Sequence, residues 1–243
     1  MRLDTSRASF KQIVKMRTGL MLTFGRWPQY SLRALERPDF MRLYSAPNPA
    51  PNPRRVLIYL AEKGVEIDII DLSILKGEQK APDFVTKNSR GQVPVLELDD
   101  GRTITESISI CRYLEDLHPH PPLFGTNAFE RAHVDMWIRR IEFNVMAPVG
   151  QFWAHAHPFT ARVITQFKDY GESTRLRYEA AARWLDGELA GRAFICGADF
   201  TMADIAALTT IDFATWIGLS MSEGCEHLSD WHARVSARAS VVG

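Results

Sequence analysis

Hydrophobic and polar positions divide the chain into a first half with mixed periodicity and a second half with helical periodicity alone. Between Met41 and Leu117, short alternating runs rich in β-branched residues come between apolar stretches with the spacing of amphipathic helices. The alternating runs predict strands, and the spaced runs predict helices. The expected strands are 41–45, 65–70, 93–98 and 102–105, and the expected helices are 53–63, 82–87 and 107–117.

Turn residues separate these elements. Four prolines between Pro47 and Pro53 are expected to keep this loop extended, so that the first helix begins at Pro53 and stops at Gly64. Asp99-Asp100-Gly101 is a hairpin turn signal, and Ser107 is expected to be the N-cap of the helix that follows the hairpin. The resulting β-α-β-α-β-β-α order is that of a thioredoxin-like domain.

The second half is predicted to be helical throughout. After the linker His118-Pro119-His120-Pro121-Pro122, helical patterns cover about 127–156, 160–190, 201–217 and 228–238. Thr201 and Asp204 have the spacing of a capping box, which predicts a helix start at Thr201. We therefore predict an N-terminal extension at 1–40, an α/β thioredoxin-like domain at 41–120 and an all-α helical bundle domain at 121–243.

Charge is unevenly distributed, although the net charge of the chain is zero. Residues 1–40 hold eight Lys or Arg and three Asp or Glu, a net of +5, so the remaining residues carry −5. The composition of the extension fits a cleavable targeting peptide, an upstream start codon read through to Met41 or, less well, a membrane-surface helix. The acidic body argues against nucleic-acid binding.

Three widely spaced cysteines, Cys111, Cys196 and Cys225, are typical of a reducing compartment, so we expect a cytoplasmic protein. The chain contains no apolar run of ~18 residues, and we expect no membrane span. Two His-x-His pairs have no carboxylate or cysteine partners nearby in the sequence. We therefore expect no metal site.

Two short motifs on either side of the hairpin predict a site that holds a small peptide by its backbone. Pro94 falls early in a strand, where it is tolerated if the backbone of Val93 faces an added extended peptide and not a neighbouring strand. Ser107 lies at a helix start, which favours an anion, and the preceding Glu106 can accept an ammonium group. The alternatives are a trans proline in an edge strand, an ordinary N-cap at Ser107 and a solvated charge at Glu106.

These motifs, together with a G-x-x-F-T-x-A-D box in the helical half, resemble the soluble, cytosolic glutathione transferases over nearly all of residues 41–243. The resemblance implies a cis peptide bond between Val93 and Pro94, glutathione bound by the first domain, an electrophile held by the second, and a homodimer. Glutathione is then a co-substrate, and no other cofactor is expected. The residues implied to bind glutathione are Gln79, Gln92, Val93, Pro94, Glu106 and Ser107.

Members of this family lower the pKa of the glutathione thiol with a Tyr, Ser or Cys near the start of the first helix. This chain has Pro53 where a Ser or Cys often stands. Asn52-Pro53 resembles the bacterial nu-class enzymes and a related fungal branch, in which an Asn approaches the sulfur, so Asn52 is the catalytic candidate. Gln79 fits the same branch, where a Gln contacts the glycine end of glutathione. Local structure alone equally accounts for Asn52 as a helix N-cap, with Pro53 at the first helical position.

The resemblance thus implies an enzyme, a dimeric glutathione transferase of detoxification that conjugates the glutathione thiolate to small apolar electrophiles. Two alternatives stay open: a glutathione-dependent disulfide or peroxide reductase, and a non-enzymatic glutathione-fold binding module. A binding module that no longer held glutathione would have no physical need to keep Gln79, Pro94, Glu106 and Ser107 together. Aromatic side chains of the helical half are candidates for the electrophile pocket or for the core: Trp137, Phe143, Phe152 and Trp153.

Overall fold

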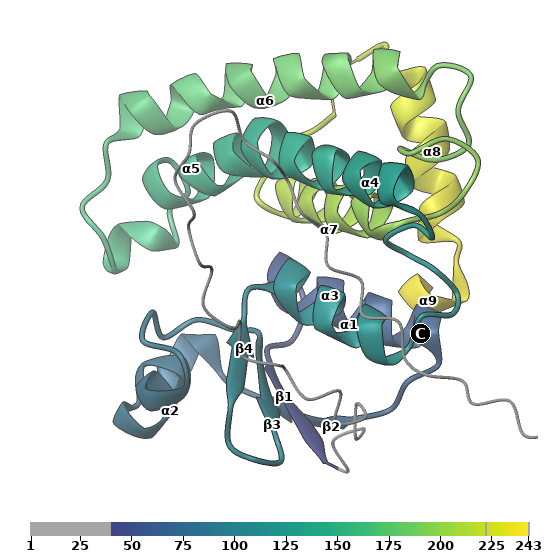
Figure 1. Ribbon diagram of the computed structural model, residues 1–243. Helices are drawn as coiled ribbons and strands as arrows, with labels where there is room; N and C mark the ends of the chain where they lie inside the picture. Colours follow the sequence, from purple (N-terminus) through teal and green to yellow (C-terminus); the bar gives the residue numbers. More distant parts are fainter. Residues whose placement is uncertain (1–39, 222, 243) are drawn as a thin grey trace, which may run out of the picture. The chain divides into compact units, whose positions relative to one another are not determined.

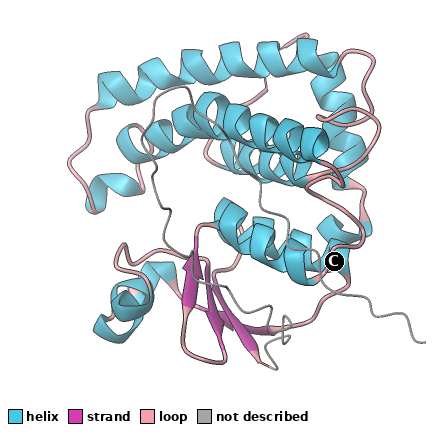
Figure 2. Cartoon of the chain, in the orientation of Figure 1, coloured by secondary structure: helices cyan, strands magenta, loops and turns pink. Residues whose placement is uncertain are grey.

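A computed structural model describes residues 40–221 and 223–242 of the chain (Figure 1). The predictions for the extension at 1–40 therefore fall outside the described residues, apart from Phe40. Within the described part, all strands belong to the first half of the chain and the second half is helical, as Figure 2 shows. The predicted fold class, a thioredoxin-like α/β domain followed by a helical domain, is confirmed.

The described strands form one mixed four-stranded sheet in the order β2-β1-β3-β4. Strands β1 and β2 are parallel, as the predicted crossover requires, whereas β3 pairs antiparallel with both β1 and β4. Each strand lies within or next to its predicted range, and β2 starts three residues later than predicted. The strands are β1 (Met41–Ser45), β2 (Asp68–Asp71), β3 (Val95–Leu98) and β4 (Thr103–Thr105).

Successive residues of the sheet face opposite sides, and each side packs on a different helix layer. Leu43 and Leu96 belong to the large core that includes residues of α1 (Pro51–Lys63) and α3 (Ser107–Leu117). Tyr44 and Val95 pack instead with Phe84 of the short helix α2 (Pro82–Lys87) in a separate cluster. Two single-turn 3-10 helices, Ile74–Lys76 and Glu78–Lys80, connect β2 to α2.

The start of α1 differs from the prediction. The helix begins at Pro51, two residues earlier than expected, and its N-cap is Ala50, which offers no side-chain cap. Pro51 and Pro53 are both accommodated because the N–H groups of the first helical turn have no partner within the helix, so their loss there costs nothing. The expectation that the proline-rich loop stays extended to Pro53 was therefore wrong, and so was the N-cap alternative for Asn52.

The start of α3 also differs by one residue. Ser107 is the first residue of the helix and not its N-cap, and the N-cap position is occupied by Glu106, whose side chain makes no capping bond. Glu106 has a φ of 68°, the one positive φ of a non-glycine residue in the described part of the chain. A residue with a Cβ in this region carries a conformational cost of about 1–2 kcal/mol. The local backbone is therefore held by its surroundings.

Helices of the second half match the predicted pattern except at two internal places and at the end of the chain, where the helix predicted at 228–238 is Glu226–Ser236 and a short helix at Ala239–Val242 was not predicted. The stretch predicted as one helix at 127–156 is interrupted by a π-helical turn at Ile141–Met146, where Pro148 removes a backbone donor from the ladder that follows. The helix predicted from 160 begins at Lys168, after a 3-10 turn at Thr160–Arg162. The helices are α4 (Ala128–Arg140), α5 (Ala147–His155), α6 (Lys168–Leu189), α7 (Met202–Trp216), α8 (Glu226–Ser236) and α9 (Ala239–Val242).

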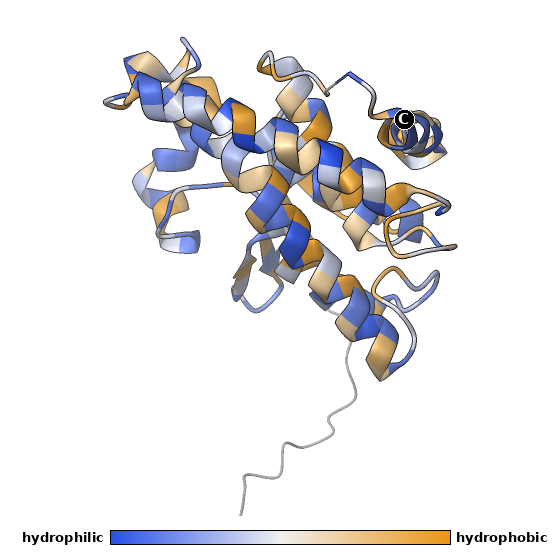
Figure 3. Ribbon diagram, turned by 90° about the horizontal axis from the view of Figure 1, so that it is seen from above, coloured by the Kyte–Doolittle hydropathy of each residue, from blue (hydrophilic) through white to orange (hydrophobic). Residues whose placement is uncertain are grey.

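Helix α7 is buried along most of its length, and its predicted capping box between Thr201 and Asp204 is present. The Asp204 carboxylate is fully buried and accepts bonds from the backbone N–H of Thr201 and Ile195 and from the indole Nε1 of Trp231, each at 2.9 Å. The helices carry both apolar and polar residues along their length, visible as orange and blue in Figure 3. None of the helices in the described part of the chain is both long and apolar enough to cross a bilayer.

The linker between the sheet and the bundle is tied to α1 and α3 through Glu115. This carboxylate accepts the hydroxyl of Tyr59 and pairs with Lys63 at 2.6 Å. Its other oxygen accepts the backbone N–H of Leu123 at 2.9 Å, and Lys63 also donates to the carbonyl of Pro121. The linker is therefore fixed by buried polar contacts.

Candidate functional site

One cavity of about 470 Å³ lies between the sheet domain and the end of α5. All seven residues that the sequence singled out line it, although they come from four separate parts of the first domain. Five of its remaining lining residues come from the helical domain, in or just after α5. The seven predicted residues are Asn52, Gln79, Gln92, Val93, Pro94, Glu106 and Ser107.

Asn52 lies in the first turn of α1, where the structure leaves few backbone donors. Pro51 and Pro53 have no N–H, and the N–H of Arg54 donates to the carbonyl of Ala50 at 3.3 Å. The N–H of Asn52 has no partner within the helix, because it belongs to the first turn. Both its backbone N–H and its side-chain amide are therefore available at the positive end of α1.

The loop before β3 is shaped by Asn88 and Gly91. The side chain of Asn88 donates to the carbonyl of Gln92 at 2.8 Å and accepts the N–H of Arg90 at 3.1 Å. Gly91 has a φ of 55°, and a Cβ there would come within 2.7 Å of the carbonyl oxygen of Gln79. The peptide bond between Val93 and Pro94 is cis, as the resemblance implied.

Gln79 has an unused hydrogen-bonding atom at the cavity. Its side-chain Oε1 is buried and has no partner, whereas its Nε2 makes a long 3.5 Å contact to the carbonyl of Ile74. A buried polar atom without a partner costs about 1–3 kcal/mol, so this amide is suited to a ligand that supplies the partner. Lys80 follows directly, and its Nζ donates to the carbonyl of Arg90 at 2.9 Å while it lines the same cavity.

Glu106 and Ser107 bring a carboxylate and a helix N-terminus to the cavity. Ser107 is buried at the first position of α3, and the N–H groups of this turn have no partner within the helix. Charged side chains of opposite sign thus line the cavity, Lys80 next to Gln79 and Glu106 next to Ser107. Such a site suits a ligand that carries both an ammonium group and carboxylates.

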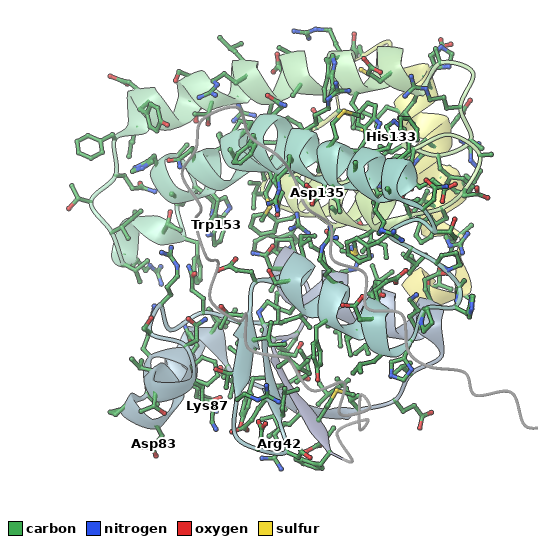
Figure 4. The ribbon with its side chains drawn as sticks, viewed as in Figure 1. Arg42, Asp83, Lys87, His133, Asp135 and Trp153 are labelled. Atoms are coloured by element: carbon green, nitrogen blue, oxygen red, sulfur yellow. The ribbon has the colours of Figure 1, made fainter. Side chains whose placement is uncertain are left out.

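The part of the cavity formed by the helical domain is largely apolar. Trp153 lies on α5, as labelled in Figure 4, and its ring packs against His157, Phe159, Phe213 and Trp216 at centroid distances of 4.6–5.7 Å. Among the four aromatic candidates, Trp153 alone lines the cavity. Trp137 and Phe152 are core residues, and Phe143 is exposed. The other lining residues on this side are Ala154, Thr160, Val163 and Ile164.

Among the described residues, neither a cysteine nor a candidate metal-binding group lies at this cavity. The three cysteines lie elsewhere: Cys111 and Cys225 are buried, and burial raises the pKa of Cys196 to about 11. Among residues 40–221 and 223–242, no group of three or more His, Cys, Asp or Glu side chains is arranged to hold a metal ion.

Comparison with known proteins identifies the family. The glutathione S-transferase N-terminal domain matches residues 50–117, and the glutathione S-transferase C-terminal domain matches residues 161–239. Glutathione S-transferase 2 of Saccharomyces cerevisiae is 35% identical over 205 residues, which cover 83% of this chain and 88% of that protein. The chain therefore belongs to the glutathione S-transferase family, and the prediction of an enzyme of this family is confirmed.

Solved structures give the same result. A glutathione S-transferase domain-containing protein from Marinobacter aquaeolei is 34% identical with a TM-score of 0.77, and the match covers 82% of this chain and 99% of that chain. The Gtt2 structure from Saccharomyces cerevisiae has the same identity and TM-score, with coverage of 83% and 98%.

Sequence reasoning missed several lining residues. Lys80 follows Gln79 directly, so the available signal was a basic residue next to a residue predicted to bind glutathione. Asn88 and Gly91 lie in a loop whose path depends on contacts with Gln79 and Gln92. Thr160, Val163 and Ile164 fall in a stretch predicted as helix, and nothing in their local pattern indicates a cavity.

Proposed function

We propose that this protein conjugates the thiolate of glutathione to small apolar electrophiles. The observation that carries the proposal is that seven residues from separate parts of the sequence, each implied to bind glutathione or its sulfur, line one cavity together with an apolar wall. We further propose that the enzyme acts in the cytoplasm as a homodimer, because these properties are typical of the family and fit the dispersed cysteines.

In the proposed complex, the two ends of glutathione occupy oppositely charged parts of the cavity. Glu106 pairs with the ammonium of the γ-glutamyl group, and Ser107 with the α3 N-terminus binds its carboxylate. The backbone of Val93 pairs with the cysteinyl residue as an added strand would. Gln79, Gln92 and Lys80 are then available for the glycine end, where the unpartnered Gln79 amide gains a partner.

The sulfur of glutathione is proposed to lie beside Asn52. An amide N–H and a helix N-terminus both favour the thiolate over the thiol, and each unit by which the thiol pKa falls is ~1.4 kcal/mol of thiolate stabilisation. The apolar side of the cavity, with Trp153, Val163 and Ile164, holds the electrophile close to the sulfur. Proximity and a more abundant thiolate together account for the rate enhancement.

The Asn52 pattern is also the basis for proposing a nu-class-like member of the family, of bacterial type. In that branch the same residues fit sulfur exchange, so a glutathione-dependent disulfide or peroxide reductase is the second candidate. No cysteine of the described residues lines the cavity, so in a reductase the glutathione thiolate would attack the substrate disulfide or peroxide directly, without a protein thiol. A non-enzymatic binding module is disfavoured by the unpartnered Gln79 amide and the strained Glu106.

A parallel assay tests the proposal. The purified full chain is given glutathione with a chloro-nitro aromatic, an organic hydroperoxide or a small disulfide, and glutathione binding is measured separately by calorimetry. We expect conjugation of the aromatic substrate to be fastest. Faster turnover of the disulfide or the peroxide would identify the reductase, and no turnover of any of the three substrates would favour the module.

A further inference from the structure

Arg55 is a buried cation one helical turn after Asn52. Its side chain is 1% exposed and lies between α1 and α7, two helices that run side by side in Figure 1. Its Nε donates to the hydroxyl of Thr209 at 3.2 Å, and its Nη2 donates to the hydroxyl of Thr210 at 3.1 Å. The same Nη2 contacts the sulfur of Met146 at 2.9 Å and the carbonyl of Ala206 at 3.4 Å.

The charge of Arg55 is only weakly compensated. Among the ion pairs of the described residues, its one carboxylate partner is Glu142 in the π-helical turn, at 3.7 Å from Nη1. Glu142 is a quarter exposed and also pairs with Arg139 at 3.0 Å. Cys111 of α3 is the other titratable group that interacts with Arg55, and burial raises the pKa of this thiol, so it stays neutral. Burial lowers the pKa of Arg55 to about 10, which leaves it charged at neutral pH.

The contacts of Arg55 fix its guanidinium but do not neutralise it. Replacing both partners of a buried ion pair by apolar side chains is often neutral or stabilising, whereas removing one partner is destabilising. The partners of Arg55 have other bonds: Thr209 donates to the carbonyl of Ile205 at 2.9 Å, and Thr210 donates to that of Ala206 at 2.7 Å. Arg55 therefore anchors α1 to α7, and because its one carboxylate partner is partly exposed and shared with Arg139, part of its positive charge is left for an anion nearby.

We propose that Arg55 stabilises an anionic ligand sulfur at the start of α1 through a fixed positive charge buried behind Asn52. Residues three apart in a helix lie on the same face, about 5–6 Å apart at Cβ, so the charge would be on the order of 10 Å from a sulfur beside Asn52. At this distance, an effective dielectric near 20 still leaves an attraction large enough to shift a thiol pKa by about one unit. This inference rests on the proposed function, because it requires glutathione to bind with its sulfur at Asn52.

The two partners of the ion pair make opposite predictions. Arg55→Met removes the positive charge, and we expect the pKa of the bound glutathione thiol to rise by about one unit. Glu142→Gln removes the compensating negative charge, and we expect the same pKa to fall by roughly half a unit. Arg55→Lys keeps the charge and should leave most of the effect in place. The measurement is a titration of thiolate absorbance in the glutathione complex of each full-length variant.

Binding of S-methylglutathione, which has no ionisable thiol, separates this inference from the proposed function. We expect its affinity to be unchanged, within twofold, in all three variants. If the wild-type chain binds neither glutathione nor its S-methyl derivative, the proposed function fails. If both bind and the thiol pKa is the same in wild type, Arg55→Met and Glu142→Gln, Arg55 is structural only and the inference fails. Should Arg55→Met not fold, the direction in which Glu142→Gln shifts the pKa of the bound thiol decides the inference alone, because Glu142 is partly exposed and its substitution should not prevent folding.

Discussion

Helices α1 and α7 are bonded to each other through Arg55 and Thr209, yet their N-termini are built in opposite ways. At α7, the Thr201–Asp204 capping box satisfies the first turn, and the N–H of Met202 donates to the carbonyl of Leu123 at 2.9 Å. At α1, the N-cap is Ala50, which has no side-chain acceptor. Both helix starts thus have few backbone N–H groups without a partner, but at α7 acceptors of the protein bind these groups, whereas at α1 prolines replace them.

The difference separates a structural helix start from one that can bind a ligand. The capping groups at the start of α7 form hydrogen bonds within the protein, so this helix start contributes to stability and is not available to a ligand. At α1, prolines remove the donors that would otherwise need a cap, and Asn52, which keeps its N–H, lines the cavity. Mutations at the α7 start should therefore affect stability, and mutations at the α1 start should affect ligand chemistry.

The largest expected effect is at α7. Asp204→Ala leaves two backbone N–H groups and the Trp231 indole without an acceptor in a buried site. Each buried donor left without an acceptor costs ~1–3 kcal/mol, so we expect a loss of about 4 kcal/mol or more in the free energy of unfolding. Chemical denaturation of the variant measures it, with Asp199→Ala, an exposed carboxylate nearby, as the matched control. A variant of normal stability without activity would assign Asp204 to the site.

At α1, Asn52→Asp should act on ligand chemistry instead. A carboxylate at ~4 Å from the sulfur costs on the order of 4 kcal/mol at an effective dielectric of 20, before relaxation. We therefore expect the bound thiol pKa to rise by about two units, with turnover lost at neutral pH and partly recovered at higher pH. Thermal stability should change little, because Asn52 caps nothing. Since no cap is lost, Asn52→Ala is an interpretable partner variant, and normal thiol titration in both would remove Asn52 from catalysis.

At the start of α3, substitutions are expected to change both stability and ligand binding. Glu106 has a positive φ, so Glu106→Gly should relieve strain and keep or raise stability, while Glu106→Ala keeps the strain. Both variants lose the carboxylate, and we expect glutathione affinity to fall by roughly 1.5–3 kcal/mol in each, the range for a charge-assisted bond. Calorimetry and thermal melting measure the two effects separately. Wild-type affinity in a folded Glu106→Ala variant would show that this carboxylate is only a solvated charge.

The smallest effect is expected in the loop before β3. Gly91→Ala would press a Cβ against the Gln79 carbonyl at 2.7 Å, at a positive φ. We expect a stability loss of about 1 kcal/mol and several-fold weaker glutathione binding. Gly101→Ala is the matched control, because it has φ +80° and nothing within 4 Å of the added Cβ. Equal affinities of the two variants for glutathione would separate the loop from the ligand.

The sequence predicts features whose partners are close along the chain. The capping box at Thr201 is correct because it depends on neighbouring residues, whereas the cis bond before Pro94 followed from the family resemblance and not from the local sequence. The start of α1 was misplaced because prolines fit equally before a helix and in its first turn, and only the tertiary structure distinguishes the two.

The prediction of a helix from residue 160 was wrong for a related reason. The Thr160 hydroxyl donates to the carbonyl of Trp153 at 2.7 Å, and the Gln166 amide donates to that of His157 at 2.8 Å. These side-chain bonds fold the segment back onto the end of α5 and bring Ile164 to the cavity. Such contacts leave no periodic signal in the sequence, because polar side chains bond to carbonyls of an earlier element.

The fixation of the linker by Glu115 has a consequence for ligand exchange. A hinge between two domains needs a connection whose backbone can rotate freely, and here the backbone N–H of Leu123 and the carbonyl of Pro121 are bonded to the charged side chains of Glu115 and Lys63. The cavity walls contributed by the two domains are therefore held at a constant spacing. Release of a bulky product then depends on local movement of the segment after α5, and the rate of turnover should follow the mobility of that short segment.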